Sequence, residues 1–323
     1  MPIRRLVTIF AAMAVTLPTL LAAAPASAGT ATRAAVVAEN RVDARTLDLT
    51  VSSPAIGQQA NVRLLLPDGW DGRQHGRTWP VLLLLGGCCW SDGDGHESWV
   101  QKTDIENYPE LRKVLVVTPI GGKAGYFSNW HKAGGPKWED FHLDEVLPLV
   151  EKNYGGGTKR AIAGLSMGGF GALSYAGRRP GMFSAAASYS GTVHTQLFML
   201  GPASVQAVLI GQGLDPAALW GDPVKDAKVW AAHNPHELTD KLKNIPVYLS
   251  AGNGEPGPLD APGAGFDVKE KAIEGMSQLV ATKLLLSGGK VQTSFYGKGT
   301  HAWPYYGREL RNSLPMLLGA LGV

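Results

Sequence analysis

A serine stands between two glycines in the stretch Gly164-Leu165-Ser166-Met167-Gly168. The apolar run 161–163 precedes it, and the glycine-rich stretch 168–177 follows it with helical character. A serine at a sharp turn from a strand into a helix has a strained backbone, and small residues must flank that turn. The pattern predicts that Ser166 is a nucleophile for acyl transfer. Because the chain has 41 glycines, the alternative is an ordinary glycine-rich turn with a surface serine.

A nucleophilic serine needs a base, and His301 is the candidate. In α/β-hydrolases an acid and then a histidine follow the serine along the chain. His301 comes after the last predicted strand, 291–295, on the loop before the closing helix. No two of the other histidines have the spacing of metal ligands, so we expect neither a metal site nor an organic cofactor.

The oxyanion hole requires two backbone N–H groups near the serine. We assign one to Met167, the residue after the nucleophile. We assign the other to Cys88, because Gly86-Gly87-Cys88 follows the apolar run 81–85 and glycine lets a backbone approach a substrate closely. Gly87, together with the aromatic residues Trp90 and Trp303, is expected to contact the substrate.

The acid of the triad is less clearly marked. The order of elements in the fold favours the loop after the predicted strand 245–250. That loop offers Glu255, Asp260 and Asp267, and their spacing does not choose among them.

Apolar strand-like runs alternate with helical patterns along the chain, which predicts a mainly parallel sheet flanked by helices, as in the α/β-hydrolase fold. We expect helices over 141–152, 268–286 and 307–318. Irregular structure, forming a cap beside the site, is expected over 192–244. Strands are predicted at 47–51, 60–66, 81–85, 114–118, 160–163, 185–189, 245–250 and 291–295.

The amino terminus has the pattern of an export signal. Arg4 and Arg5 precede an apolar run to about residue 24, and Ala26-Ser27-Ala28 is typical of a cleavage site. We therefore predict a signal peptide over 1–28, a flexible leader over 29–45 and one catalytic domain over 46–323. The protein is then secreted, with cell-envelope association permitted; a retained membrane anchor is the alternative.

Charge and cysteine content narrow the function classes further. The formal net charge of +3 falls to +1 without Arg4 and Arg5, so the mature chain lacks the basic surface of a nucleic-acid binder. The only cysteines, Cys88 and Cys89, are adjacent and cannot form a disulfide framework. The sequence does not decide whether these two cysteines form a disulfide with each other or remain free thiols.

Several stretches, read in order from about Leu47 to Leu317, resemble the antigen 85 mycolyltransferases and related secreted, esterase D-like hydrolases of actinobacteria. The matching stretches are Gly121-Gly122 with Tyr126-Phe127-Ser128-Asn129-Trp130, Trp138-Glu139-Asp140-Phe141 with Glu145, Gly164-Leu165-Ser166-Met167, Trp220-Gly221-Asp222, Ala251-Gly252-Asn253-Gly254, Ile273-Glu274-Gly275 and Gly299-Thr300-His301-Ala302-Trp303-Pro304-Tyr305.

The resemblance implies Glu274 as the acid, because the family carries it in a Leu-Glu-Gly stretch. It also implies ester chemistry on an acyl donor, with a sugar or glycerol as a further acceptor. The sequence departs from the family at the oxyanion loop. Mycolyltransferases read Asp-Gly-Leu-Arg there, whereas this chain reads Gly86-Gly87-Cys88-Cys89, so the charges that help hold trehalose are missing.

These observations predict a secreted serine carboxylic-ester hydrolase or acyltransferase that acts through an acyl-enzyme on Ser166, His301 and Glu274. Its substrate is a small-molecule or lipid ester, without nucleic acid and without an integral membrane segment after signal cleavage. A dedicated acyltransferase to a sugar or glycerol is one alternative. A non-catalytic protein that binds the cell envelope or matrix is another, although a binder has no need of a strained serine.

Overall fold

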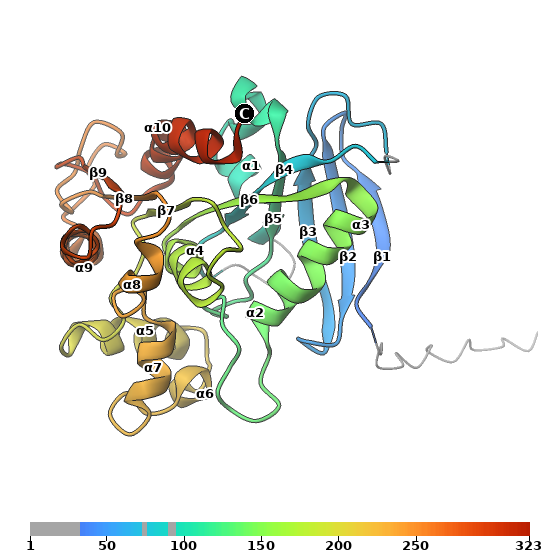
Figure 1. The fold of residues 1–323 in the computed structure, drawn as a ribbon. Coiled ribbons are helices and arrows are strands. Elements are labelled where there is room, and N and C mark those ends of the chain that lie inside the picture. The colour runs from blue at the N-terminus through green and yellow to red at the C-terminus, as the bar shows by residue number, and fades with distance from the viewer. Residues whose placement is uncertain (1–32, 73–75, 90–94) are drawn as a thin grey trace, which may run out of the picture. The chain divides into compact units, whose positions relative to one another are not determined.

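A mixed sheet forms the centre of the fold (Figure 1). A computed structural model describes residues 33–72, 76–89 and 95–323. The predicted signal peptide and Trp90 lie outside the described residues. Within those residues the nine strands have the order β1-β2-β3-β5-β4-β6-β7-β8-β9. The first pairs, from β1 to β5, are antiparallel, and every pair from β5 to β9 is parallel.

All eight predicted strands are confirmed in position, although several are longer or shorter by a few residues. The strands are β1 (Ala35–Arg41), β2 (Thr46–Ser53), β3 (Gln58–Leu65), β4 (Trp79–Leu85), β5 (Leu115–Pro119), β6 (Gly156–Leu165), β7 (Ala186–Tyr189), β8 (Val247–Ala251) and β9 (Val291–Phe295).

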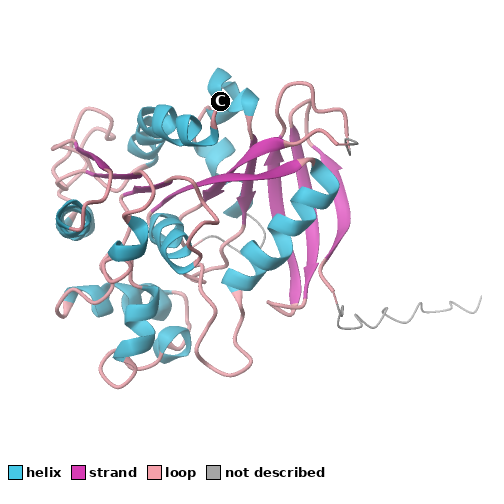
Figure 2. Cartoon of the chain, in the orientation of Figure 1, coloured by secondary structure: helices cyan, strands magenta, loops and turns pink. Residues whose placement is uncertain are grey.

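Helices cover both faces of the sheet, as Figure 2 shows. The predicted helices are present, and α10 begins four residues earlier than expected, with Pro304 in its first turn, where a missing N–H costs nothing. The helices are η1 (Gly95–Glu97), α1 (Ser98–Lys102), η2 (Ile105–Asn107), η3 (Pro109–Lys113), α2 (Trp138–Asp140), the π-helical turn η4 (Phe141–Val146), α3 (Leu147–Tyr154), α4 (Met167–Arg178), α5 (Leu200–Gly211), α6 (Pro216–Trp220), α7 (Ala227–His233), α8 (Thr239–Leu242), α9 (Val268–Leu286) and α10 (Trp303–Leu321).

The apolar runs in the central strands are continuous because both faces of those strands are buried. In β4, Leu83 and Leu85 contribute to the core shared with α3, α4 and α9, whereas Leu82 and Leu84 pack with α1 and α10 on the opposite face. All four side chains are fully buried. This two-sided core fixes the carboxyl ends of β4, β6, β7 and β8, beyond which sites form in such sheets.

Two sequence-based expectations about secondary structure are wrong. Within the predicted flexible leader, Ala35–Arg41 forms the edge strand β1, paired with β2. Its side chains are mostly exposed, so no apolar alternation marks it. The region expected to be irregular, 192–244, contains α5, α6, α7 and α8.

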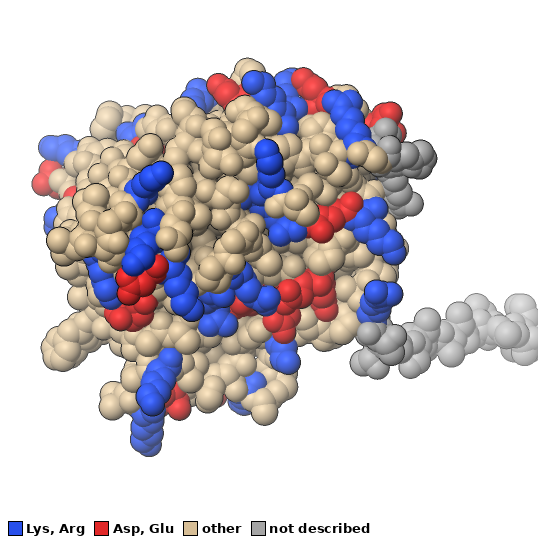
Figure 3. Space-filling view, viewed as in Figure 1, with Lys and Arg blue, Asp and Glu red and all other residues tan. Residues whose placement is uncertain are grey.

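On the face in Figure 3, no patch of a single charge sign is seen among the described residues. Among the described residues, no helix combines the length and the apolar character needed to cross a bilayer. On the face shown, lysine and arginine side chains are interspersed with aspartate and glutamate.

Candidate active site

Ser166 occupies the sharp turn between β6 and α4. Its backbone has φ 52° and ψ −119°, in a region that costs free energy for a residue with a side chain. Its N–H donates to the carbonyl of Tyr189 at 2.9 Å, which ties the turn to β7. A Cβ atom on Gly168 would lie 2.4 Å from the carbonyl oxygen of Gly86, so only glycine allows this close approach. The strand–turn–helix geometry expected from the sequence is therefore present.

His301 lies beside this serine, on the loop after β9. Its Nε2 is 2.9 Å from the Ser166 Oγ. Its backbone N–H donates to the Oδ2 of Asp267 at 2.9 Å, which fixes the loop against the start of α9. The His301 side chain is only 12% exposed, and its imidazole packs edge-on against the Tyr306 ring. Packing therefore restricts the orientation of the imidazole.

The carboxylate that meets the imidazole belongs to Glu270. Its Oε2 lies 2.7 Å from the His301 Nδ1. Its other oxygen accepts hydrogen bonds from the Ser190 hydroxyl at 2.7 Å and from the Gly252 N–H at 2.8 Å. Glu270 is fully buried, and these three partners hold its carboxylate in one orientation.

Glu274, the acid implied by the family resemblance, does not contact His301. Its Oε2 accepts from the Lys271 ammonium at 2.7 Å instead. Glu274 lies about one helical turn beyond Glu270 on the same face of α9, because 3.6 residues make one turn. The structure thus corrects the acid from Glu274 to Glu270, since the first turn of α9 is the part that reaches the histidine loop.

The three acids offered by the loop after β8 have other partners. Asp260 accepts from the Tyr305 hydroxyl at 2.8 Å and also binds the hydroxyl of Thr300. Glu255 lies 3.5 Å from the Lys298 ammonium at the surface. Asp267 caps α9 by accepting from the Glu270 N–H at 3.0 Å. They shape the histidine loop and the start of α9 without touching the imidazole through their side chains.

The loop after β4 packs directly against the nucleophile. A Cβ atom on Gly87 would lie 2.8 Å from the Leu165 Cδ1 and 3.7 Å from the Ser166 Cβ. The N–H groups of Cys88 and Met167 have no acceptor among the residues that the structure describes. An oxyanion donor must be free of other acceptors in this way before a substrate binds.

The adjacent cysteines are joined to each other. Cys88 and Cys89 form a disulfide between neighbouring residues, which decides between the two states left open by the sequence. The Cys89 N–H donates to the Lys123 carbonyl at 2.8 Å. This hydrogen bond anchors the loop to the segment after β5. The position of the adjacent Cys88 N–H is fixed through Cys89.

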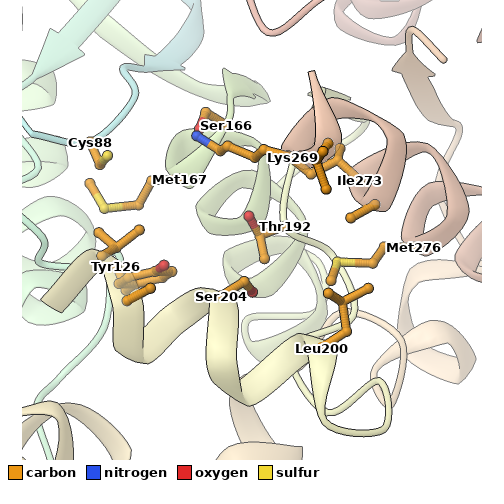
Figure 4. A pocket seen from close by; sticks show the side chains of 14 residues that line it. Cys88, Tyr126, Ser166, Met167, Thr192, Leu200, Ser204, Lys269, Ile273 and Met276 are labelled. Carbon is orange, nitrogen blue, oxygen red and sulfur yellow. The ribbon is translucent and has the colours of Figure 1, made fainter. Parts of the chain in front are cut away.

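An apolar pocket opens beside Ser166 (Figure 4). Its volume is about 420 Å³, within the usual range for small-molecule sites. Helices α5 and α9 form its walls, and Lys269 is the one charged residue among the described residues that line it. The lining residues are Cys88, Tyr126, Ser166, Met167, Thr192, Leu200, Ser204, Ala207, Val208, Val268, Lys269, Ala272, Ile273 and Met276.

Comparison with known proteins identifies the family. The family model described as "Putative esterase" matches residues 53–317. The chain belongs to this esterase family. The chain is also 34% identical over 228 residues to Esterase Rv1288 of Mycobacterium tuberculosis (strain H37Rv), a match that covers 67% of this chain and 48% of that protein. The chain thus spans about half the length of that relative.

Further relatives of this esterase-family chain agree with the resemblance to antigen 85. The diacylglycerol acyltransferase/mycolyltransferase Ag85A of Mycobacterium tuberculosis (strain H37Rv) is 29% identical over 290 residues, covering 85% of this chain and 81% of that protein. Among solved structures, Mycobacterium tuberculosis MPT51 (FbpC1) has a TM-score of 0.68 at 24% identity, over 84% of this chain and 97% of that one. An S-formylglutathione hydrolase from Agrobacterium tumefaciens has a TM-score of 0.65 at 13% identity, over 87% and 99%. These structures support the α/β-hydrolase fold.

Of the two aromatic residues expected to contact the substrate, the structure describes only Trp303. Trp90 lies outside the described residues. Trp303 packs edge-on against Trp99, with ring centroids 5.5 Å apart, and it does not line the pocket beside Ser166. Of the three tentative substrate residues, Gly87 is the one that the structure brings against the serine.

Proposed function

We propose that this protein is a serine carboxylic-ester hydrolase or acyltransferase that works through an acyl-enzyme on Ser166. The observation that carries the proposal is the continuous hydrogen-bonded line from the Ser166 Oγ to His301 at 2.9 Å and from His301 to Glu270 at 2.7 Å. This arrangement has the geometry needed to activate a serine by a base that a third group orients.

The chemistry follows from these contacts. His301 takes the Ser166 proton as the Oγ attacks an ester carbonyl, and Glu270 holds the imidazole tautomer and stabilises the imidazolium. The N–H groups of Cys88 and Met167 donate to the oxyanion of the tetrahedral intermediate. When the intermediate collapses, His301 protonates the departing alcohol and the acyl group stays on Ser166. Water, or a second alcohol such as a sugar or glycerol, then attacks the acyl-enzyme in the same way.

We place the acyl chain in the apolar pocket between α5 and α9. Each methylene that leaves water contributes about 0.8 kcal/mol, which corresponds to roughly a fourfold change in an equilibrium constant. We therefore expect kcat/KM for p-nitrophenyl esters to rise by up to about fourfold per added methylene until the pocket is full.

A substitution in the pocket wall tests this placement. Ala272→Trp on α9 fills the pocket and should flatten the rise with chain length. Gln278→Trp is the matched control, because Gln278 is exposed on the same helix and does not line the pocket. An unchanged chain-length series in Ala272→Trp would place the acyl chain elsewhere.

Analysing the products with and without glycerol shows whether water or an alcohol accepts the acyl group.

The acid limb of the pH profile is a separate prediction. Burial lowers the pKa of His301 from its ordinary value of 6.5; the hydrogen bond to Glu270 raises it, and the charge of Lys269 lowers it. Only the neutral imidazole can accept the serine proton, so a lower pKa keeps the base active in more acidic solution. We expect the acid limb of kcat/KM for a neutral ester to have its midpoint below pH 6.5. A midpoint at about pH 7 or above would contradict this assignment of the base.

Export and the location of the protein rest on the sequence pattern of residues 1–28. We propose a secreted enzyme on that basis, tested by amino-terminal sequencing of the protein recovered from the medium of cells expressing the full chain. Cleavage after Ala28 is the expected result, and an intact terminus on cell-retained protein would contradict it.

A further inference from the structure

Among the described residues that line the pocket, Lys269 alone carries a charge. Lys269 lies in the first turn of α9, immediately before Glu270, and it lines the same pocket as Ser166. In Figure 4 its side chain extends across the pocket toward Ser166. Its positive charge also acts on the buried imidazole of His301, where it lowers the pKa. The ammonium group is therefore close to the place where a substrate ester must react.

The described residues give this ammonium group no partner. No hydrogen bond or ion pair of the Lys269 side chain is found among them, although its backbone N–H donates to Asp267. The nearby carboxylates are engaged, since Asp267 accepts from the backbone of His301 and Glu270, and Glu270 holds the His301 imidazole. Partial desolvation by the surrounding atoms lowers the pKa of Lys269, although the negative charges of Asp267 and Glu270 raise it.

A surface lysine ordinarily lays its methylenes over apolar surface and keeps its charge in open water. Lys269 is exposed, yet its side chain points toward the nucleophile. This placement has a cost in the proposed reaction, because the transition state generates an imidazolium on His301 and like charges repel. A negative charge on the substrate would bind Lys269 and offset this repulsion at the same time.

We propose that Lys269 is a specificity-determining residue that favours esters carrying a carboxylate or phosphate on their alcohol portion. This inference rests on the proposed esterase function and names a substrate class for it. The anion belongs to the alcohol portion because the other described lining residues are uncharged and mostly apolar, and an anion buried among them would lose its hydration. At the mouth, the alcohol leaves beside Ser166 and within reach of the ammonium group.

The direct test compares two esters that differ only in a phosphate group, 1-butyrylglycerol 3-phosphate and 1-butyrylglycerol. The wild-type enzyme should show a kcat/KM ratio of about ten in favour of the phosphate ester, the lower end for a hydrogen bond to a charged group, because Lys269 is partly open to solvent. Lys269→Met should reduce this ratio to about one or less, and Lys269→Arg should keep most of it. The wild-type ratio should also fall as salt is added, because an exposed ion pair is screened.

Lys271→Met is the matched control. It removes the same charge from the same helix, but the Lys271 ammonium binds Glu274 and does not line the pocket. Its ratio should equal that of the wild type. A second measurement needs only the neutral ester: Lys269→Met should move the acid limb of the pH profile upward, because it removes a charge that lowers the pKa of His301.

Equal ratios in the wild type and Lys269→Met would overturn the inference. So would a preference that depends on Lys269 but appears only with p-nitrophenyl hemiglutarate against p-nitrophenyl pentanoate, since the anion would then belong to the acyl portion. These results differ from a failure of the proposed function, in which the folded wild-type enzyme hydrolyses neither the charged nor the neutral esters.

Discussion

Ser166→Ala should lower kcat for a p-nitrophenyl ester by on the order of 10⁴-fold or more. The Oγ is the only atom of this residue that can form the acyl-enzyme, and it lies 2.9 Å from the His301 Nε2. The residual rate would come from the oxyanion donors and the pocket, which remain when the nucleophile is removed. Steady-state kinetics with purified protein measures the change, with background hydrolysis subtracted.

The fold should survive this substitution, because alanine removes one oxygen from a small buried residue. Thermal unfolding of Ser166→Ala should therefore resemble that of the wild type. Ser287→Ala is a suitable control, since the Ser287 hydroxyl donates to the Lys283 carbonyl at the far end of α9. Near-normal turnover by folded Ser166→Ala would exclude the proposed mechanism.

Glu270→Gln should lower kcat by about 10³- to 10⁴-fold, whereas Glu274→Gln should change it by no more than about twofold. Glutamine keeps the shape of Glu270 but loses the charge that stabilises the imidazolium, and its amide group favours the wrong imidazole tautomer. Glu274 loses only its ion pair with Lys271, whose side chain is 58% exposed. The Glu274 carboxylate is itself buried, so loss of its charge should affect stability more than kcat, because Glu274 binds Lys271 and does not contact the imidazole.

This pair of variants distinguishes two assignments of the acid. A large loss in Glu274→Gln with a small loss in Glu270→Gln would favour the assignment implied by the family resemblance over the one seen in the structure. Asp260→Asn completes the series. It should reduce stability more than chemistry, because Asp260 binds Thr300 and Tyr305 around the histidine loop and does not contact the imidazole.

The sequence was sufficient to find Ser166 and His301 because each depends on a local pattern. Glycines around the serine and a histidine after the last strand reflect the geometry of a turn and of a strand end. The acid was missed because the family's Leu-Glu-Gly stretch was matched to Ile273-Glu274-Gly275, whereas Glu270 lies one turn earlier on the same face of the helix and in no such stretch. One signal could have separated them. Asp267 and Glu270 have the spacing of a helix cap and its third residue, which marks the first turn of α9.

The fold was predictable where burial produces a clear apolar pattern. The central strands are buried on both faces and appear as continuous apolar runs. The edge strand β1 has an almost entirely exposed surface, so its pairing with β2 leaves no such pattern. The disulfide between Cys88 and Cys89 could not be predicted either, because adjacent cysteines can be free thiols or form a disulfide.

The most direct test of a reactive serine is to map the site of covalent labelling. The mature protein is treated with a fluorophosphonate probe, digested and analysed by mass spectrometry. We expect one label per chain, on the peptide that contains Ser166, and a rate of labelling that falls sharply in Glu270→Gln and not in Glu274→Gln. A label on a different residue, or an unlabelled Ser166 in folded protein, would contradict it.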